Sequence, residues 1–278
     1  MSVTIGGATR LYAIVGDPIA QVRSPAAYAD VFARHGIDAV MIPAHVLPDH
    51  FDETIRGLME LGNLDGMVVT VPYKARIVPF ATRVGPTAAL IGAVNALRRE
   101  PDGSWTGEMF DGTGFVHAMR RRGGALGGRR VALFGAGGAG SAIGCALAGE
   151  GAASLAIIDP QRARADALAA RLSAAFPACE IAAADRLPAG RDMIVNASTV
   201  GMRADDGLPG DIGELAPGTL VGDVVTADAP TALVREATRQ RCIVVEGRDM
   251  VVGQIDAMLA FFRLAPEPSR AASIAAEH

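Results

Sequence analysis

Short apolar runs, each about as long as one β-strand, alternate with helix-length segments along almost the whole chain of 278 residues. Parallel strands need long crossover connections, usually helices, and strands covered on both faces are rich in Val, Ile and Leu. The pattern therefore predicts an α/β fold with parallel sheets built from β-α-β units. The expected strands cover 11–16, 39–46, 66–72, 131–135, 155–159, 192–197, 220–225 and 242–247.

Local signals predict how some of the connections fold. Ser24 followed by Pro25 predicts an N-cap and a first-turn proline for a helix that runs to about Gly36. The Pro-Asp-Gly segment at 101–103 predicts a hairpin turn. Residues 84–95 are expected to form a loop.

Glycines at 123–128 break the chain after a helix that is expected between Gly112 and Arg122. This break predicts a joint between two domains. The tail at 266–278 is small and polar, and we expect it to be frayed.

Composition excludes several classes of partner. The 26 Lys and Arg are balanced by 30 Asp and Glu, so the chain lacks the basic footprint of a nucleic-acid-binding or membrane-surface protein. The three cysteines fit neither a disulfide framework nor a metal site, and the five histidines show no metal spacing. The uncharged stretch 131–149 is nearly long enough to cross a bilayer, but its glycines divide it into a strand, a turn and a helix. We expect a cytoplasmic protein with reduced thiols and neither a metal nor a membrane anchor.

A glycine-rich loop begins where the expected strand at 131–135 ends, and a helix is expected after it. The first glycine permits a tight turn, the second lets the backbone approach a pyrophosphate, and the third allows close helix–strand packing. Amides at the helix N-terminus would bind the phosphates. This strand-turn-helix context predicts a dinucleotide site rather than a plain glycine-rich turn. The loop consists of Gly135, Ala136, Gly137, Gly138, Ala139 and Gly140.

Asp159 predicts which dinucleotide binds, because it ends the next expected strand, 24 residues after Gly135. A carboxylate at this position accepts hydrogen bonds from the adenosine ribose hydroxyls and repels a 2′-phosphate. We therefore expect NAD in preference to NADP. Arg162 and Arg164 leave the alternative open, because either guanidinium could reach a phosphate, although both also suit the solvated face of a helix.

Further segments resemble motifs of the shikimate dehydrogenase family, in the family's order and over nearly the whole chain. They are 16–25, which is similar to GNPIxHSxSP, 69–74 (NVTxPxK), 92–95 (GAVN), 111–115 (the end of NTDGxGF), 196–202 (NATxxGM) and 247–254 (GxxMLxxQ).

The resemblance implies a fold and a set of site residues. A substrate-binding α/β domain would cover 1–111, completed by helices from 248–278, and a Rossmann domain would cover 112–247, with the active site between them. Lys74 and Asp111 would be the catalytic pair. By the same resemblance, the substrate would be held by Ser24, Thr70, Asn95 and Gln254, and the cofactor by 135–140 and Asp159, with Val224 and Gly247 near its nicotinamide end.

The chemistry of alcohol oxidation explains why a lysine and a carboxylate are useful together. A base must lie within hydrogen-bond reach of the hydroxyl while hydride leaves for the nicotinamide. Lys74 could take that proton, and return it in the reverse direction, while Asp111 orients it. Without the resemblance, Lys74 would be interpreted as an exposed loop cation and Asp111 as a turn residue.

Several positions depart from the family pattern. Val22 replaces a serine that would bind the substrate carboxylate, Gln21 replaces a histidine, Met109 and Phe110 replace Asn-Thr, and Thr226 replaces a tyrosine. Each lost hydroxyl contact could cost about 1–3 kcal/mol. The departures predict a pocket tuned away from that of the usual shikimate enzyme, either toward a related hydroxy acid such as quinate or toward weaker turnover of shikimate.

We therefore expect an oxidoreductase that transfers hydride reversibly between NAD and the ring hydroxyl of shikimate or a close cyclic hydroxy acid. The alternative is a non-catalytic NAD-binding protein of the same fold, but the retained polar residues argue against it. A methyltransferase that used the glycine-rich loop would leave the other motifs unexplained. A homodimer is compatible with the sequence, which does not set the oligomeric state.

Overall fold

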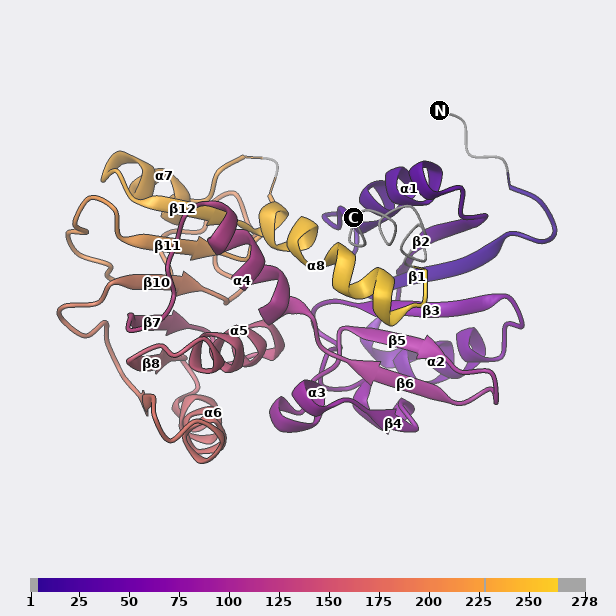
Figure 1. Cartoon of the computed structure of the whole chain (residues 1–278), viewed down its shortest axis with the longest axis horizontal. Helices are drawn as coiled ribbons and strands as arrows, with labels where there is room; N and C mark the ends of the chain where they lie inside the picture. The colour runs from indigo at the N-terminus through magenta and orange to yellow at the C-terminus, as the bar shows by residue number, and fades with distance from the viewer. Residues whose placement is uncertain (1–4, 228, 265–278) are drawn as a thin grey trace, which may run out of the picture.

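The computed structural model describes residues 5–227 and 229–264. Two six-stranded sheets form the two halves of the molecule, and helices α4 (Asp111–Arg121) and α8 (Gly247–Phe261) run through the region where the halves meet (Figure 1). Within the described residues, no helix is both long and apolar enough to cross a membrane. The tail at 266–278, expected to be frayed, lies outside the described residues.

The first sheet is mixed, with the strand order β2-β1-β3-β5-β6-β4. β1 pairs in parallel with β2 and β3, whereas β5 is antiparallel to β3 and β6. The β5–β6 hairpin confirms the turn predicted at 101–103, and it needs no crossover helix, so this sheet is parallel only in part. The strands are β1 (Arg10–Gly16), β2 (Ala39–His45), β3 (Leu64–Val69), β4 (Arg83–Val84), β5 (Ala96–Arg99) and β6 (Trp105–Glu108).

The helices of the first half correct two predictions. α1 (Ser24–His35) has Arg23, not Ser24, as its N-cap, because Ser24 already has helical conformation. The expected loop at 84–95 contains α3 (Pro86–Ile91), which starts at a proline and stops at Gly92 with φ +69°. The other helices of this half are η1 (Pro48–His50), α2 (Phe51–Met59) and η2 (Val78–Phe80).

The second sheet is parallel throughout, with the order β12-β11-β10-β7-β8-β9. This is the doubly wound arrangement, and its order reverses between β7 and β10, where ligands bind in such sheets. The strands are β7 (Arg130–Phe134), β8 (Ser154–Ile158), β9 (Glu180–Ala183), β10 (Met193–Asn196), β11 (Leu220–Asp223) and β12 (Ile243–Glu246), with helices α5 (Gly138–Gly149), α6 (Arg162–Ala175) and α7 (Ala232–Arg239).

All eight expected strands form, which confirms the α/β prediction. The two sheets fall within 10–108 and 130–246. The exact domain limits at 111 and 247 stay a prediction.

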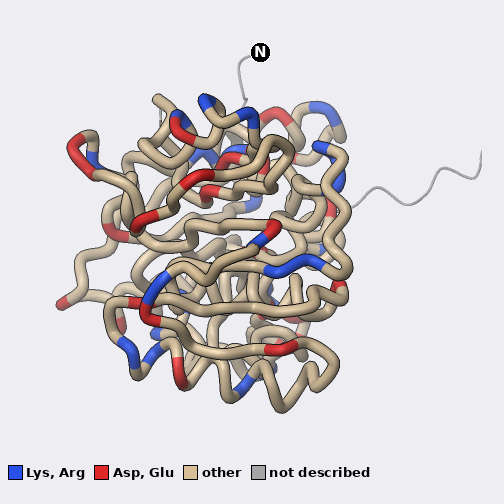
Figure 2. Tube along the Cα trace, turned by 90° about the vertical axis from the view of Figure 1, so that its left-hand side faces the viewer, with Lys and Arg blue, Asp and Glu red and all other residues tan. Residues whose placement is uncertain are grey.

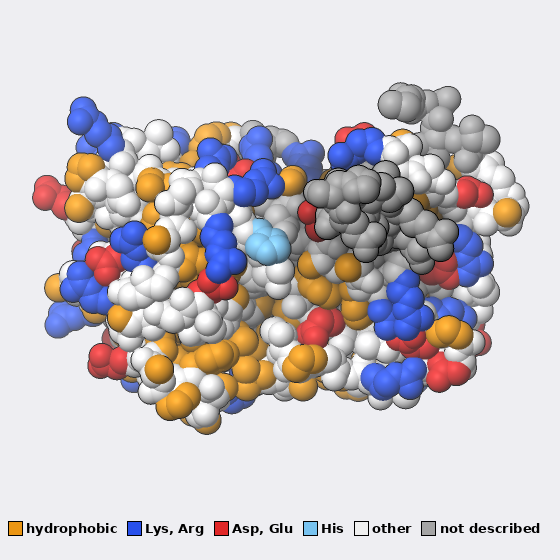
Figure 3. All heavy atoms as spheres, in the orientation of Figure 1, with side chains coloured by type: hydrophobic (Ala, Val, Ile, Leu, Met, Phe, Trp, Pro, Cys, Tyr) orange, Lys and Arg blue, Asp and Glu red, His pale blue; other side chains and the backbone are white. Residues whose placement is uncertain are grey.

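Figure 2 shows charges of both signs interspersed along the trace, and on the face in Figure 3 apolar side chains gather over the alanine-rich helices α5 and α6.

α4 packs closely against helices on both of its sides because of two glycines. A Cβ on Gly114 would lie 2.5 Å from the carbonyl oxygen of Met250 on α8. A Cβ on Gly112 would lie 2.3 Å from that of Ala142 on α5. Any larger residue would push these helices apart. Asp111, the first residue of α4, is therefore held in a fixed position at the junction of the two halves.

Candidate functional site

Four polar residues from separate parts of the chain form one hydrogen-bonded network. Lys74 Nζ donates to Asp111 Oδ2, and Asn95 Nδ2 donates to Asp111 Oδ1 at 2.8 Å. The same Asn95 amide donates to Gln254 Oε1 at 3.1 Å. The side chains of Lys74 and Asp111 are only 15% and 3% exposed. The structure thus brings together four of the residues that the sequence placed in a catalytic or substrate-binding role.

Each member of the network is held by its backbone surroundings. Lys74 follows β3, and its carbonyl oxygen accepts a hydrogen bond from Val94 N at 2.7 Å. Asp111 lies in the first turn of α4, where the positive end of the helix dipole stabilises a carboxylate. Asn95 Oδ1 accepts from Phe110 N at 2.8 Å, so the amide is oriented with its donors toward Asp111. A buried ion pair with its remaining atoms satisfied in this way keeps one geometry.

Ser24 and Thr70 reach the same edge of the first sheet. Ser24 is buried at the start of α1, after the loop that leaves β1, and Thr70 directly follows β3. Since β1 and β3 are adjacent and parallel, both residues lie at carboxyl ends of strands. Gly16 permits this arrangement, because a Cβ there would lie 2.4 Å from Thr70 Cγ2. Their role in binding substrate stays a prediction.

The glycine-rich loop has the features that a dinucleotide site needs. Gly135 has φ +99°, which favours glycine, and a Cβ on Gly140 would lie 1.9 Å from the Gly135 carbonyl oxygen. Gly137 is the N-cap of α5, and a Cβ there would meet no atom within 4 Å. The N-terminus of α5 therefore has free space beside Gly137, and amides at a helix N-terminus are the groups that bind phosphates. Ala136 and Ala139 complete the loop.

Gly138 joins this loop to the polar network. A Cβ on Gly138 would lie 3.0 Å from Lys74 Cβ and 3.1 Å from Lys74 Cδ. The aliphatic part of the lysine side chain therefore rests directly on the first residue of α5. A cofactor bound along this loop would lie next to the amine of Lys74.

Asp159 follows β8 and contacts the glycine-rich loop. Its carboxylate accepts hydrogen bonds from Ala136 N and Gln161 N, both at 2.8 Å. Of the two arginines that could have bound a 2′-phosphate, Arg162 is paired with Asp166 at 2.9 Å and with Asp185 at 2.6 Å.

The two residues expected near the nicotinamide end touch one another. A Cβ on Gly247 would lie 2.4 Å from the carbonyl oxygen of Val224. These residues follow the adjacent parallel strands β12 and β11. The structure thus places Val224 and Gly247 together at the carboxyl edge of the second sheet.

Sequence reasoning missed the buried acid that holds this segment. Asp223 is 1% exposed and accepts hydrogen bonds from Thr231 Oγ1 at 2.6 Å, Val225 N at 3.1 Å and Asn196 Nδ2 at 3.1 Å. Burial raises its pKa to about 6. Asn196 and Asp223 end β10 and β11 and lie within the strands expected at 192–197 and 220–225, so polar residues near the ends of two apolar runs are the available signal.

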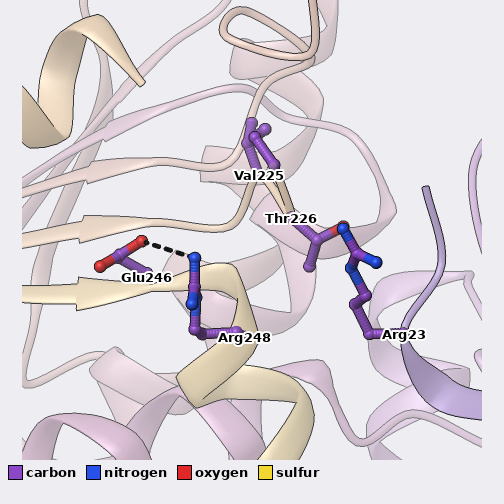
Figure 4. A pocket seen from close by; sticks show the side chains of 6 residues that line it. Arg23, Val225, Thr226, Glu246 and Arg248 are labelled. Carbon is purple, nitrogen blue, oxygen red and sulfur yellow. Dashed lines mark ion pairs between the residues drawn. The ribbon is translucent and has the colours of Figure 1, made fainter. Parts of the chain in front are cut away.

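Sequence reasoning also missed a pocket between the two halves. It has a volume of 270 Å³, and Figure 4 shows the Arg23 side chain extending from the start of α1 toward Thr226. In the sequence, Thr226 stands out only as a departure from the family pattern. Nothing local in the sequence connects residues so far apart. The pocket is lined by Arg23, Val225, Thr226, Ala227, Glu246 and Arg248.

One half of the molecule is a doubly wound sheet with a glycine-rich turn, and the other α/β half carries the Lys74–Asp111 pair. Together they define a two-part dinucleotide-binding α/β protein. Residues 14–97 match the shikimate dehydrogenase substrate binding domain. Over 271 residues the chain is 36% identical to a shikimate dehydrogenase (NADP(+)) of Rubrobacter xylanophilus, covering 95% of this chain and 94% of that one. The chain belongs to the shikimate dehydrogenase family.

Solved structures agree with this assignment. Shikimate 5-dehydrogenase from Listeria monocytogenes, in complex with shikimate and NAD, is 27% identical, with a TM-score of 0.83 and 96% of each chain covered. Quinate dehydrogenase from Corynebacterium glutamicum, in complex with NAD, is 28% identical, with a TM-score of 0.81, and the match covers 94% of this chain and 96% of that one.

Proposed function

We propose that this chain is a dehydrogenase that transfers hydride reversibly between NAD and the ring hydroxyl of shikimate or a close cyclic hydroxy acid such as quinate. The observation that carries the proposal is the buried Lys74–Asp111 pair, held by Asn95 and resting against Gly138 of the dinucleotide loop. General acid–base chemistry and a hydride acceptor are the two requirements of alcohol oxidation.

The residues of the network have separate tasks in this reaction. The bound dinucleotide supplies the hydride acceptor or donor. Lys74 takes the hydroxyl proton in oxidation and returns it in reduction, while Asp111 fixes the position of the lysine amine. Asn95 and Gln254 orient Asp111 and offer further polar contacts to the substrate. Ser24 and Thr70 bind the part of the substrate that faces the first sheet.

The position of Asp159 supports NAD as the preferred cofactor. Its carboxylate lies against the loop amide of Ala136, so a 2′-phosphate brought to this strand end would meet a negative charge. Arg162, one of the two arginines considered for a 2′-phosphate, is already paired with two aspartates. The curated relative from Rubrobacter xylanophilus is named for NADP(+), whereas the Listeria monocytogenes and Corynebacterium glutamicum structures hold NAD.

Initial rates of NAD and NADP reduction with shikimate and with quinate test the proposal. We expect a higher kcat/KM with NAD than with NADP for at least one of the two acids. Asp159→Ser should shift the preference toward NADP, because the repelling charge is removed. Tighter binding and faster turnover with NADP in the unaltered protein would overturn the cofactor assignment. Binding of NAD without turnover of either acid would favour the non-catalytic alternative.

A further inference from the structure

The carboxyl edge of the second sheet contains a buried acid that the proposed reaction does not use. Asp223 is the last residue of β11 and is only 1% exposed. Its partner in register on β10 is Asn196, which is the last residue of that strand. A carboxylate that is removed from water is unfavourable unless hydrogen bonds replace its hydration. Asp223 therefore depends on the groups that donate to it.

These donors come from three segments of the chain. Val225 N and Asn196 Nδ2 both donate to Asp223 Oδ1 at 3.1 Å. Thr231 Oγ1, in the N-cap residue of α7, donates to Asp223 Oδ2 at 2.6 Å. An ionised carboxylate accepts on both oxygens and donates from neither, so it suits a place that three donors face. The side chain thus joins the end of β10, the residues after β11 and the start of α7.

The backbone that follows Asp223 is fixed by this arrangement. Val224 N donates to Asn196 O at 3.0 Å, and Val225 N donates to the carboxylate. A Cβ on Gly247 would lie 2.6 Å from the carbonyl oxygen of Val225 and closer still to that of Val224. The backbone at 224–225 is therefore held by β10 and by the carboxylate, and it touches the first residue of α8.

The same contacts continue to the glycine-rich loop. Asn196 Oδ1 accepts hydrogen bonds from Ser198 N at 3.1 Å and from Ser198 Oγ at 2.6 Å. A Cβ on Gly135 would lie 2.8 Å from Ser198 N. A chain of contacts thus runs from Gly135 through Asn196 and Asp223 to Gly247, along the carboxyl ends of four adjacent strands.

The topology of the sheet indicates which part of a dinucleotide lies over each end of this chain of contacts. A doubly wound sheet consists of two mononucleotide-binding halves, and the dinucleotide binds across the crevice where the strand order reverses. β7, β8 and β9 form the half that carries Asp159, where the adenosine ribose is expected. β10, β11 and β12 form the other half (Figure 1). The nicotinamide is therefore expected beside Val224, Val225 and Gly247.

We infer that Asp223 is a positioning residue for the nicotinamide half of the cofactor: it holds the backbone at 224–225 in the place where the nicotinamide ring binds. The inference rests on the proposed function, whose cofactor end it specifies. Asp223 acts through the backbone of Val224 and Val225, and it leaves the adenosine half of the site to the glycine-rich loop and Asp159.

The test compares NAD with ADP-ribose, which keeps the adenosine, the pyrophosphate and the second ribose and lacks the nicotinamide. Asp223→Ala leaves Val225 N and the Asn196 amide without their acceptor, so the backbone at 224–225 shifts. In calorimetric titration, Kd for NAD should rise about fivefold, as for one lost hydrogen bond, while Kd for ADP-ribose stays within about twofold. With shikimate as substrate, kcat should fall about tenfold, because the ring carbon that accepts hydride is displaced.

Conservative variants should restore binding. Asp223→Asn keeps an oxygen that faces Val225 N and the Asn196 amide, so it should recover most of the affinity for NAD. Thr231→Val removes the third donor and should weaken NAD selectively, by a smaller factor than Asp223→Ala. Thr231→Ser keeps the hydroxyl and should bind NAD as the unaltered protein does.

Asp192→Ala is the matched control, because Asp192 precedes β10 at the opposite edge of the same sheet. Its carboxylate also accepts three hydrogen bonds, from Arg130 N, Nε and Nη2, each at 3.0 Å. Asp192→Ala should lower the urea midpoint and leave both Kd values unchanged. A selective effect on NAD at Asp223 is then separated from a general loss of stability.

Equal rises in Kd for NAD and ADP-ribose, or no rise in either, would show that Asp223 does not position the nicotinamide. If Asp223→Ala does not fold, the comparison of Thr231→Val with Thr231→Ser decides the question by the same measurement. The titrations need no turnover, so inactivity with shikimate and quinate would count against the proposed function alone. If the unaltered protein prefers NADP, the cofactor assignment fails, and NADP with 2′-phospho-ADP-ribose gives the same comparison.

Discussion

The contact between Gly138 and Lys74 makes a sharp prediction about the Gly138→Ala variant. The added Cβ would lie 3.0 Å and 3.1 Å from two carbons of the lysine side chain, whereas carbon atoms pack best at about 3.5–4.0 Å. Lys74 must therefore move by roughly 0.5 Å. A misplacement of about 1 Å in an active site can cost about 100-fold in rate, so we expect kcat to fall about 3- to 10-fold.

The same variant should fold normally. Gly138 has no positive φ, and replacing glycine by alanine at a compatible position stabilises a protein by about 0.4–1 kcal/mol through the unfolded state. This gain offsets the crowding, so the free energy of unfolding should stay within about 1 kcal/mol of the original value. The assay is steady-state kinetics with shikimate and NAD, combined with urea unfolding.

Two further glycine substitutions serve as controls. Gly137→Ala places a methyl group in open space that a phosphate would occupy, so it should raise KM for the cofactor more than it lowers kcat. Gly57→Ala, in α2, also adds a methyl group without a neighbour and should change neither constant. If Gly138→Ala keeps the original kcat, Lys74 does not rest on the loop during turnover, and the reasoning fails.

The remaining predictions concern the charged residues of the site. Lys74→Met should lower kcat about 100-fold or more, with a smaller change in KM, and a near-normal kcat would remove Lys74 from the mechanism. Asp223→Asn should change how stability depends on pH, because the pKa of Asp223 is raised from 3.8 to about 6. The folded protein binds this proton more tightly than the unfolded chain does, so the contribution of Asp223 to stability falls as pH rises from about 4 to 6. Between pH 4.5 and 7, the urea midpoint should shift further toward lower stability in the unaltered protein than in the variant, and equal shifts would contradict the assignment.

Features encoded within a few residues were predictable from the sequence. The strands could be located because continuous apolar runs mark strands buried on both faces. The dinucleotide turn could be located because Gly135 and Gly140 serve backbone geometry that only glycine allows. The error at α3 was avoidable, since Pro86 and Gly92 are ordinary start and stop signals of a helix.

Features that depend on contacts between distant segments were not predictable in the same way. Gly112 and Gly114 stand out in the sequence only as part of the segment 111–115, but they are needed because α5 and α8 approach α4 closely. The pocket combines Arg23 with Arg248, and no local pattern links two arginines on different halves of the molecule. Lys74 and Asp111 are 37 residues apart, so their spacing does not indicate that they meet. The family resemblance does indicate it, because a family motif includes residues that contact each other only in the folded protein.

Helix α8 shows how far a sequence motif can specify a site. Gly247 and Gln254 are seven residues apart, so they lie on the same face of the helix, about 10.5 Å apart along its axis. Gly247 approaches the carbonyl oxygen of Val224, and Gln254 accepts a hydrogen bond from Asn95. One helical face therefore sets the distance between the expected nicotinamide end and the network around the reacting hydroxyl. The seven-residue spacing was visible in the sequence, whereas Asn95 as the partner of Gln254 depends on how α8 packs across the first sheet.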